Sequence, residues 1–77
     1  MHDAITLGMN VHENFARNVR RLRNARKLSQ EELGFRVGLH RTSITLLECR
    51  RQSPTLRTMD KLATALGVTV YDLIKDP

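Results

Sequence analysis

The sequence has few of the features that hold small secreted or metal-binding domains together. It contains one cysteine, so an internal disulfide is impossible, and no Cys/His grouping has the spacing of a zinc site. It has no tryptophan and no apolar run near the roughly 18 residues that cross a membrane. The start Met1-His2-Asp3 lacks the basic region of a signal peptide. We therefore expect a cytoplasmic protein without metal, cofactor or membrane contact, held together by apolar packing.

Groupings typical of enzymes are also missing. The chain has no paired carboxylates, no nucleophile elbow, and no Walker or dinucleotide-binding loop. With 77 residues it forms one domain at most and leaves no room for a large substrate cavity. The sequence therefore predicts a binding protein and not an enzyme.

Positive charge is abundant and is concentrated in one half of the chain. The formal net charge is +5, but residues 17–51 alone hold ten basic and three acidic side chains, or +7. The remaining residues hold three basic and five acidic side chains, or −2. A basic segment suits a polyanion, since each neutralised phosphate releases counterions. From charge alone, a solvated surface that only keeps the protein soluble is about equally plausible.

Apolar residues recur at helical spacing along most of the chain. Residues 1–9 show no period and are expected to form a flexible arm before a domain at 10–77. Asn10 and Glu13 have the spacing of a capping box, which predicts a first helix from Asn10 to about Lys27.

Four shorter helices are predicted after the first, which makes the fold class all-α with five helices. Ser29 and Glu32 form a stronger capping box for the second helix, which Gly38 ends. A third helix is predicted over 42–49. A fourth helix is expected to be capped by Thr55 and to end at Gly67, with an inward stripe of Leu56, Met59, Leu62, Ala63 and Leu66. A last helical turn or two is expected to begin at Thr69 and Asp72.

A short helix, a glycine turn and a second helix inside a basic segment are the layout of a helix-turn-helix. Its side chains resemble the phage-repressor family, of the Cro/cI-like or XRE type, from about Phe15 to Ile74. The motifs that carry the resemblance are Leu28-Ser29-Gln30-Glu31-Glu32-Leu33, Gly38-Leu39, Arg41-Thr42-Ser43-Ile44, Leu47-Glu48 and Pro54-Thr55-Leu56. The stretch from Gly38 to Ile44 looks most like the controller proteins of restriction-modification systems.

The resemblance implies a compact lambda-repressor-like domain that reads duplex DNA with its third helix. Arg41 is the best candidate for a base contact, because a guanidinium can bind guanine N7 and O6 together. Gln30 is expected to grip a phosphate at the start of the second helix. The other expected DNA contacts are His40, Thr42, Ser43, Thr45, Leu46, Arg50 and Arg51. For Leu46, contact with a thymine methyl and burial against the first helix remain equally open.

Four positions have expected structural roles. Arg23 and Glu48 match family positions that form an ion pair between the first and third helices. Arg50 stands where relatives often have a glycine in a left-handed turn, which is unfavourable for arginine. Gly34 lies inside the second helix, where a small residue allows close helix packing.

We expect a homodimer on a palindromic operator, because one short helix discriminates too few base pairs alone. The apolar residues near the C-terminus exceed what one last turn buries, and the family often pairs there; they are Val68, Val70, Leu73 and Ile74. The chief alternative is an antitoxin-like interaction module that also sequesters a second protein. Binding of structured RNA is a lesser alternative, because the chain lacks an aromatic stacking platform.

Overall fold

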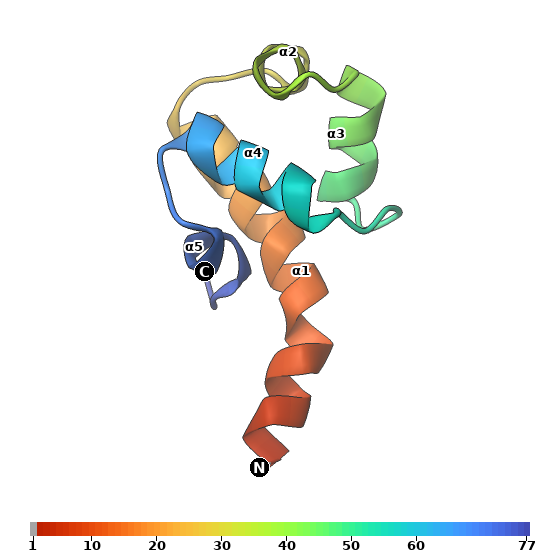
Figure 1. The fold of residues 1–77 in the computed structure, drawn as a ribbon, viewed down its shortest axis with the longest axis vertical. Helices are drawn as coiled ribbons and strands as arrows, with labels where there is room; N and C mark the ends of the chain where they lie inside the picture. The colour runs from red at the N-terminus through yellow and green to blue at the C-terminus, as the bar shows by residue number, and fades with distance from the viewer. Residues whose placement is uncertain (1) are drawn as a thin grey trace.

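The computed structural model describes the backbone of residues 2–77 and the side chains from Val11 onward. In this part the chain forms five helices and no strand, which confirms the all-α prediction. They are α1 (His2–Ala25), α2 (Gln30–Val37), α3 (Arg41–Glu48), α4 (Leu56–Leu66) and α5 (Val70–Ile74). Figure 1 shows α2 and α3 at the end of the molecule away from the N-terminus, with α4 and α5 beside α1.

The first helix starts earlier than the sequence predicted. Helical backbone begins at His2 and continues through Asn10 and Glu13, so the capping box expected there is wrong. The preceding segment holds no proline, and a capping pattern does not break a helix that is already running. Glu13 instead pairs with two arginines, Arg17 and Arg50. The role of residues 1–9 as a separate arm stays a prediction, because their side chains lie outside the described part.

The predicted caps of α2, α4 and α5 are confirmed. Ser29 Oγ accepts the Glu32 N–H at 2.9 Å, and Glu32 Oε1 accepts the Ser29 N–H at 2.8 Å. The hydrogen bond from the Ser29 backbone N–H to the carboxylate is the main reason that the pKa of Glu32 is lowered. Thr55 caps α4 and Thr69 caps α5 with Asp72 in a second capping box. Such caps stabilise a helix by about 1 kcal/mol each.

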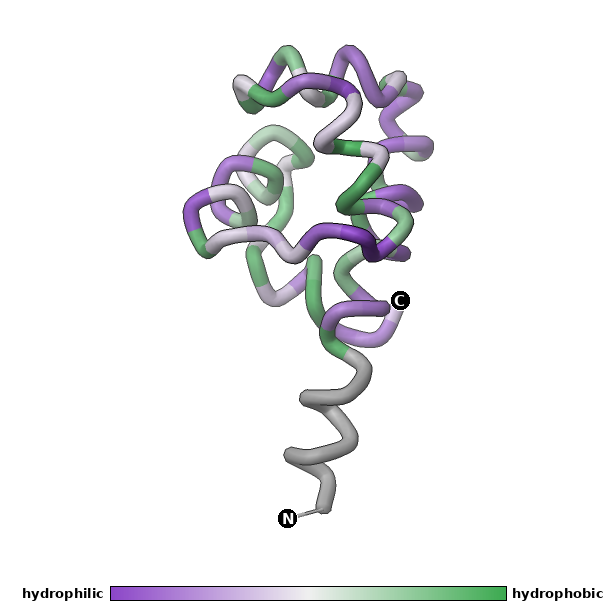
Figure 2. The backbone as a smooth tube through the Cα atoms, turned by 90° about the vertical axis from the view of Figure 1, so that its right-hand side faces the viewer, coloured by the Kyte–Doolittle hydropathy of each residue, from purple (hydrophilic) through white to green (hydrophobic). Residues whose placement is uncertain are grey.

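The core lies where all five helices meet. Its fully buried side chains are Phe15, Val19, Leu33, Ile44, Leu47, Leu62, Leu66 and Leu73. In Figure 2 apolar segments of the different helices turn toward one another. One predicted member is wrong: Leu56 is 82% exposed, because the first turn of α4 lies at the edge of the bundle. Burying each large apolar side chain contributes roughly 1.5–3 kcal/mol.

Two buried asparagines attach α5 to α1. Asn18 Nδ2 donates to the carbonyl oxygens of Leu73 at 3.0 Å and Lys75 at 2.8 Å. Asn14 Nδ2 donates to the Ile74 carbonyl oxygen at 3.1 Å. Carbonyl groups at the end of a helix have no partner within it, and these amides supply one. The short α5 is therefore held by hydrogen bonds as well as by Leu73.

Candidate nucleic-acid interface

The turn between α2 and α3 depends on two glycines. Gly38 ends α2 with φ 75°, a left-handed conformation that favours glycine. A Cβ on Gly34 would collide with the backbone carbonyl oxygen of Leu39. The Leu39 N–H also donates to the Gly34 carbonyl oxygen at 2.8 Å. Close backbone contact at Gly34, as the sequence predicted, therefore sets where α3 leaves α2.

His40 caps the start of α3. Its Nδ1 accepts the Thr42 backbone N–H at 3.1 Å and lies 3.0 Å from Thr42 Oγ1. As a result α3 begins at Arg41, one residue before the predicted start. His40 was predicted as a DNA contact, and its capping role was missed because it requires knowledge of the helix start. Arg41 and Thr42 are exposed and Ser43 is half-buried.

The other end of α3 is fixed to α1 by a buried carboxylate. Arg23 Nε lies 2.7 Å from Glu48 Oε2, and Arg23 also donates to Glu48 Oε1 at 3.0 Å. The Glu48 side chain is fully buried, and Arg23 donates in addition to the Leu28 carbonyl oxygen at 2.9 Å. The hydrogen bond to Glu48 is the main reason that the pKa of Arg23 is raised. The ion pair expected between these residues is thus present.

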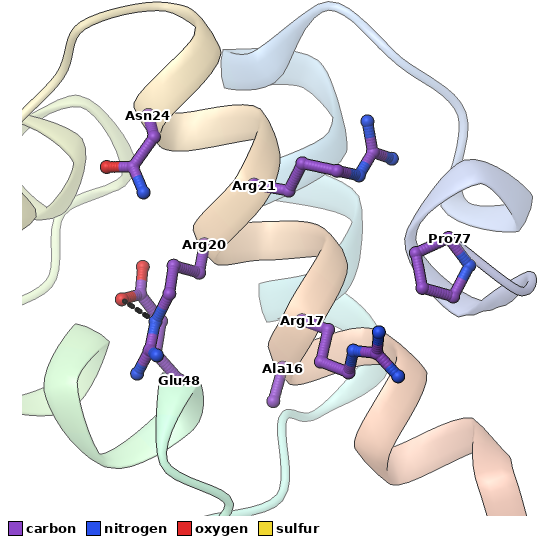
Figure 3. Close-up of a pocket in the computed structure, with 7 residues that line it drawn as sticks. All are labelled: Ala16, Arg17, Arg20, Arg21, Asn24, Glu48 and Pro77. Carbon is purple, nitrogen blue, oxygen red and sulfur yellow. Dashed lines mark ion pairs between the residues drawn. The ribbon is translucent and has the colours of Figure 1, made fainter.

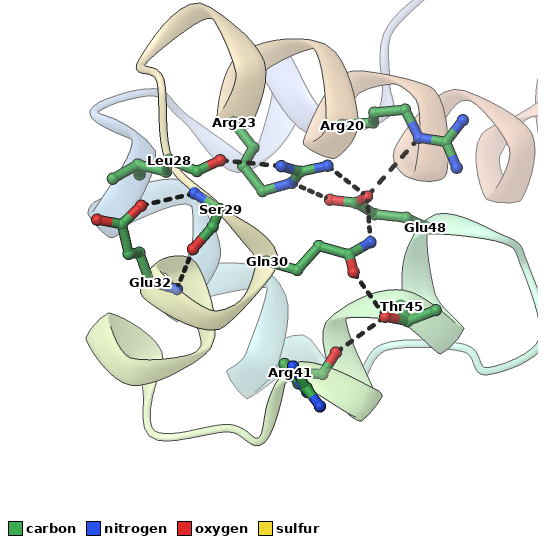
Figure 4. Close-up of polar contacts among 9 residues, drawn as sticks. All are labelled: Arg20, Arg23, Leu28, Ser29, Gln30, Glu32, Arg41, Thr45 and Glu48. Atoms are coloured by element: carbon green, nitrogen blue, oxygen red, sulfur yellow. Dashed lines mark hydrogen bonds and ion pairs between the residues drawn. The ribbon is translucent and has the colours of Figure 1, made fainter.

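Figure 4 shows that Gln30 and Thr45 extend this network. Gln30 Nε2 donates to Glu48 Oε1 at 3.1 Å, and Thr45 Oγ1 lies 2.8 Å from Gln30 Oε1 and 3.1 Å from the Arg41 carbonyl oxygen. Both side chains were predicted as DNA contacts, and their contact with each other was not predicted. No local pattern predicts it, because 15 residues separate the two. The network joins α1, α2 and α3.

The remaining predicted contacts lie at the end of α3 and just after it. Leu46 is half-buried, which does not decide between its two interpretations. Arg50 has φ 63°, the left-handed conformation foreseen at that position, and pairs with Glu13 at 3.6 Å. Arg51 is exposed, and its N–H donates to the Leu46 carbonyl oxygen at 2.9 Å. Arg50 and Arg51 therefore follow directly from the helix that carries Arg41.

A comparison with protein families identifies this arrangement. The Helix-turn-helix family HTH_3 matches residues 19–73, which is more than half of the chain. The chain belongs to the helix-turn-helix family. This confirms the predicted resemblance to regulators of the XRE type.

Individual relatives of this helix-turn-helix protein are similar over most of its length. It is 43% identical over 74 residues to control protein C.SmaI of Serratia marcescens, covering 96% of this chain and 88% of that one. Among solved structures, the hypothetical transcription factor NHTF from Neisseria has a TM-score of 0.85 and 36% identity, covering 90% of this chain and 79% of that chain. The restriction-modification controller protein C.AhdI from Aeromonas hydrophila has a TM-score of 0.75 and 38% identity, covering 78% of this chain and 91% of that chain.

These relatives establish the broad function of the helix-turn-helix protein. They are transcriptional regulators and control proteins, so the chain is a DNA-binding regulator and not an enzyme. Among the described residues, no group of three or more His, Cys, Asp or Glu side chains has the arrangement of a metal site. In the same part of the chain, no helix is both long and apolar enough to span a membrane.

The predicted dimer residues of the helix-turn-helix protein differ in exposure. Val68, Val70 and Ile74 are half-buried and so retain accessible apolar surface. Leu73 is fully buried in the core of the single chain, so it is not available to a partner, and its prediction as a dimer-interface residue is wrong. Its side chain belongs to the same buried cluster as Leu62 and Leu66. Tyr71, which the sequence analysis did not include, is 66% exposed beside this surface.

Proposed function

We propose that this regulator binds a palindromic operator as a homodimer, with the start of α3 in the major groove of each half-site. The observation that carries the proposal is the exposure of Arg41 and Thr42 on a helix whose far end is anchored by the buried Glu48. A base-reading helix must hold its leading side chains at a fixed depth and rotation, and an ion pair to α1 supplies that constraint. The similarity to control proteins supports a role in controlling a restriction-modification system.

The side chains at the start of α3 suit readout of bases. The Arg41 guanidinium can donate to guanine N7 and O6, a contact worth about 1–3 kcal/mol of discrimination against other bases. Thr42 and Ser43 offer hydroxyls to a base or a phosphate, and the ring of His40 leaves Nε2 available beyond its cap. Further along α3, Thr45 and the apolar Leu46 complete the surface, with the thymine methyl as the partner suited to Leu46.

Contacts to the DNA backbone position the helix in the groove. Arg50 and Arg51 follow α3 directly and are exposed, so they suit phosphates of the same half-site. At the start of α2, free backbone N–H groups and the positive helix end favour a phosphate. Gln30 has one amide proton engaged by Glu48 and can offer the other to the same phosphate.

Dimer formation couples two such half-sites. A single α3 contacts too few base pairs for useful discrimination, whereas two linked helices multiply it. The accessible apolar surface of Val68, Val70 and Ile74 is the proposed interface. Half-sites about one helical turn of DNA apart would match this two-fold symmetry.

Selection of bound duplexes from a random pool tests the proposal. The wild-type protein should recover a palindrome whose halves are about 10 base pairs apart, and should sediment as a dimer. Arg41→Ala should relax base choice at one position in each half while leaving the others unchanged. Arg36→Ala, which removes an exposed arginine from the other side of α2, is the matched control. A motif without symmetry, or equal losses for both variants on selected and random duplex, would overturn the proposal.

A further inference from the structure

A groove next to the proposed DNA-binding surface is lined by a row of basic side chains on α1. Its volume is about 350 Å³. Figure 3 shows Arg20 directed toward Glu48 of α3, while Arg17 and Arg21 extend toward the side where Pro77 lies. The complete lining is Ala16, Arg17, Arg20, Arg21, Asn24, Glu48 and Pro77. We call it the arginine groove.

Helical spacing places these side chains on one face of α1. Residues 17, 20, 21 and 24 are three or four positions apart, so they lie in a row. The row is on the solvent side, opposite Phe15 and Val19 in the core. The side chains of Arg17 and Arg20 are 63% and 57% exposed. These charged side chains therefore do not contribute to the packing of the apolar core.

Positive charge in the groove is only partly compensated among the described residues. Glu48 Oε1 already accepts a hydrogen bond from Arg23. The distance from Arg20 Nε to this oxygen is 3.7 Å, which is too long for a hydrogen bond. Arg17 lies 3.8 Å from Glu13, a carboxylate that it shares with Arg50. Arg17 and Arg50 thus share the exposed carboxylate of Glu13, while Arg20 lies near the buried Glu48 that Arg23 already binds. Their guanidinium groups retain hydrogen-bond donors for an anion.

The groove is also continuous with the proposed DNA surface. Arg20 and Gln30 approach the same oxygen of Glu48, so Arg20 lies next to the start of α2. At the other end of the row, Glu13 links Arg17 to Arg50 in the segment after α3. The row therefore connects two places where the proposed function puts phosphates.

We propose that Arg17 and Arg20 bind phosphates of the DNA backbone next to the half-site that α3 reads. The inference rests on the proposed function and extends it by a sequence-independent anchor. The ligand class is a DNA phosphodiester, because guanidinium groups bind phosphate oxygens through paired, charge-assisted hydrogen bonds. The anchor adds affinity and salt dependence without changing which bases are chosen.

The test compares Arg17→Gln and Arg20→Gln with Arg36→Gln, which removes the same charge from α2 outside the groove. Affinity for the selected duplex is measured across a series of salt concentrations. Each groove variant should bind about five- to tenfold more weakly at low salt, with the slope of log K against log salt smaller by about 0.9. Their selected motifs should equal that of the wild type. Arg36→Gln should change neither affinity nor slope to this extent.

Neutral methylphosphonate linkages locate the contact on the DNA. At one or two backbone positions, neutralisation should weaken wild-type binding but cause no further loss for Arg20→Gln. Slopes equal to that of Arg36→Gln, or additive losses at every position, would overturn the inference while leaving the proposed function intact. If the wild type selects no motif, the proposed function fails, and slopes on random duplex still test the groove. If Arg20→Gln lowers the melting temperature, Arg17→Gln provides the test.

Discussion

Two polar junctions on α1 hold two different helices, and they use different chemistry. Toward α3, the junction is a charged network centred on the buried Glu48 and reaching Arg23 and Gln30. Toward α5, it consists of the neutral amides of Asn14 and Asn18, which donate to backbone carbonyl oxygens, and Asn14 also donates to the Asp76 carboxylate at the surface. The α1 side chains of both junctions belong to one helix, so we attribute the difference in chemistry to the helices that they hold, α3 and α5.

The charged junction constrains orientation more strongly than the neutral one. A guanidinium bonded to both oxygens of a carboxylate fixes distance and plane together, and Gln30 adds a third helix to the same group. The asparagines close the end of α5, whose start is capped by Thr69 and whose Leu73 is buried in the core. The comparison teaches that the stronger constraint is applied to the helix proposed to read bases, at the cost of a buried charge.

The largest expected effect comes from stranding that charge. Arg23→Leu leaves the fully buried Glu48 with one neutral hydrogen bond from Gln30 and the 3.7 Å approach of Arg20, and should lower the free energy of unfolding by about 3–5 kcal/mol. Glu48→Leu should cost less, because the Arg23 side chain is 12% exposed and keeps its bond to Leu28. Urea unfolding of both variants and of the double variant measures this. A double variant less stable than Arg23→Leu would contradict the idea of a stranded charge.

A smaller effect is expected at the neutral junction. Asn18→Ala removes two hydrogen bonds to the carbonyl oxygens of Leu73 and Lys75, and should cost about 1–3 kcal/mol in urea unfolding. It leaves no charge unpaired in the core. Asn24→Ala, an exposed asparagine on the same helix, is the control and should change stability by less than about 0.5 kcal/mol. A loss at Asn18 equal to that of Arg23→Leu would remove the distinction between the junctions.

The smallest expected effect is a pH dependence at the start of α5. The Thr69 backbone N–H, followed by Lys75 and the Thr69 hydroxyl, lowers the pKa of Asp72 from 3.8 to about 2. Because the folded-state pKa is the lower one, its stabilisation is complete above about pH 4 and disappears as the pH falls through about 2. Asp72→Asn retains an acceptor but no charge. The melting temperature of the wild type should therefore exceed that of Asp72→Asn at pH 5, and the difference should become smaller at pH 3 and pH 2. A difference that does not change with pH would show that the Asp72 charge is not its cause.

Local features were predictable, since their partners lie within a few residues. The capping box of Ser29 and Glu32 and the left-handed Gly38 follow from rules of helix termini. The same rules erred at Asn10, because a capping pattern permits a helix start without requiring one when helical backbone precedes it. They also missed His40 as a cap, since the predicted start of α3 was one residue late.

Side-chain contacts between helices could not be predicted from spacing alone. Leu56 and Leu73 are both apolar and both near helix starts, yet the first is 82% exposed and the second fully buried. Helical periodicity gives a face, but only the position of neighbouring helices decides whether that face is covered. The Arg23–Glu48 pair was expected only through family resemblance.

By itself, the sequence determined five helices, the caps of α2, α4 and α5, and the basic segment, because these depend on local hydrogen bonds, periodicity and charge. Its motifs also resembled a DNA-binding family. Tertiary structure decided that Gln30 and Thr45 share a network with Glu48 and that Leu73 joins the core. It also decided that Arg17 and Arg20 line a groove next to the proposed DNA-binding surface. Those outcomes depend on how the helices pack in three dimensions, which brings together residues far apart in the chain.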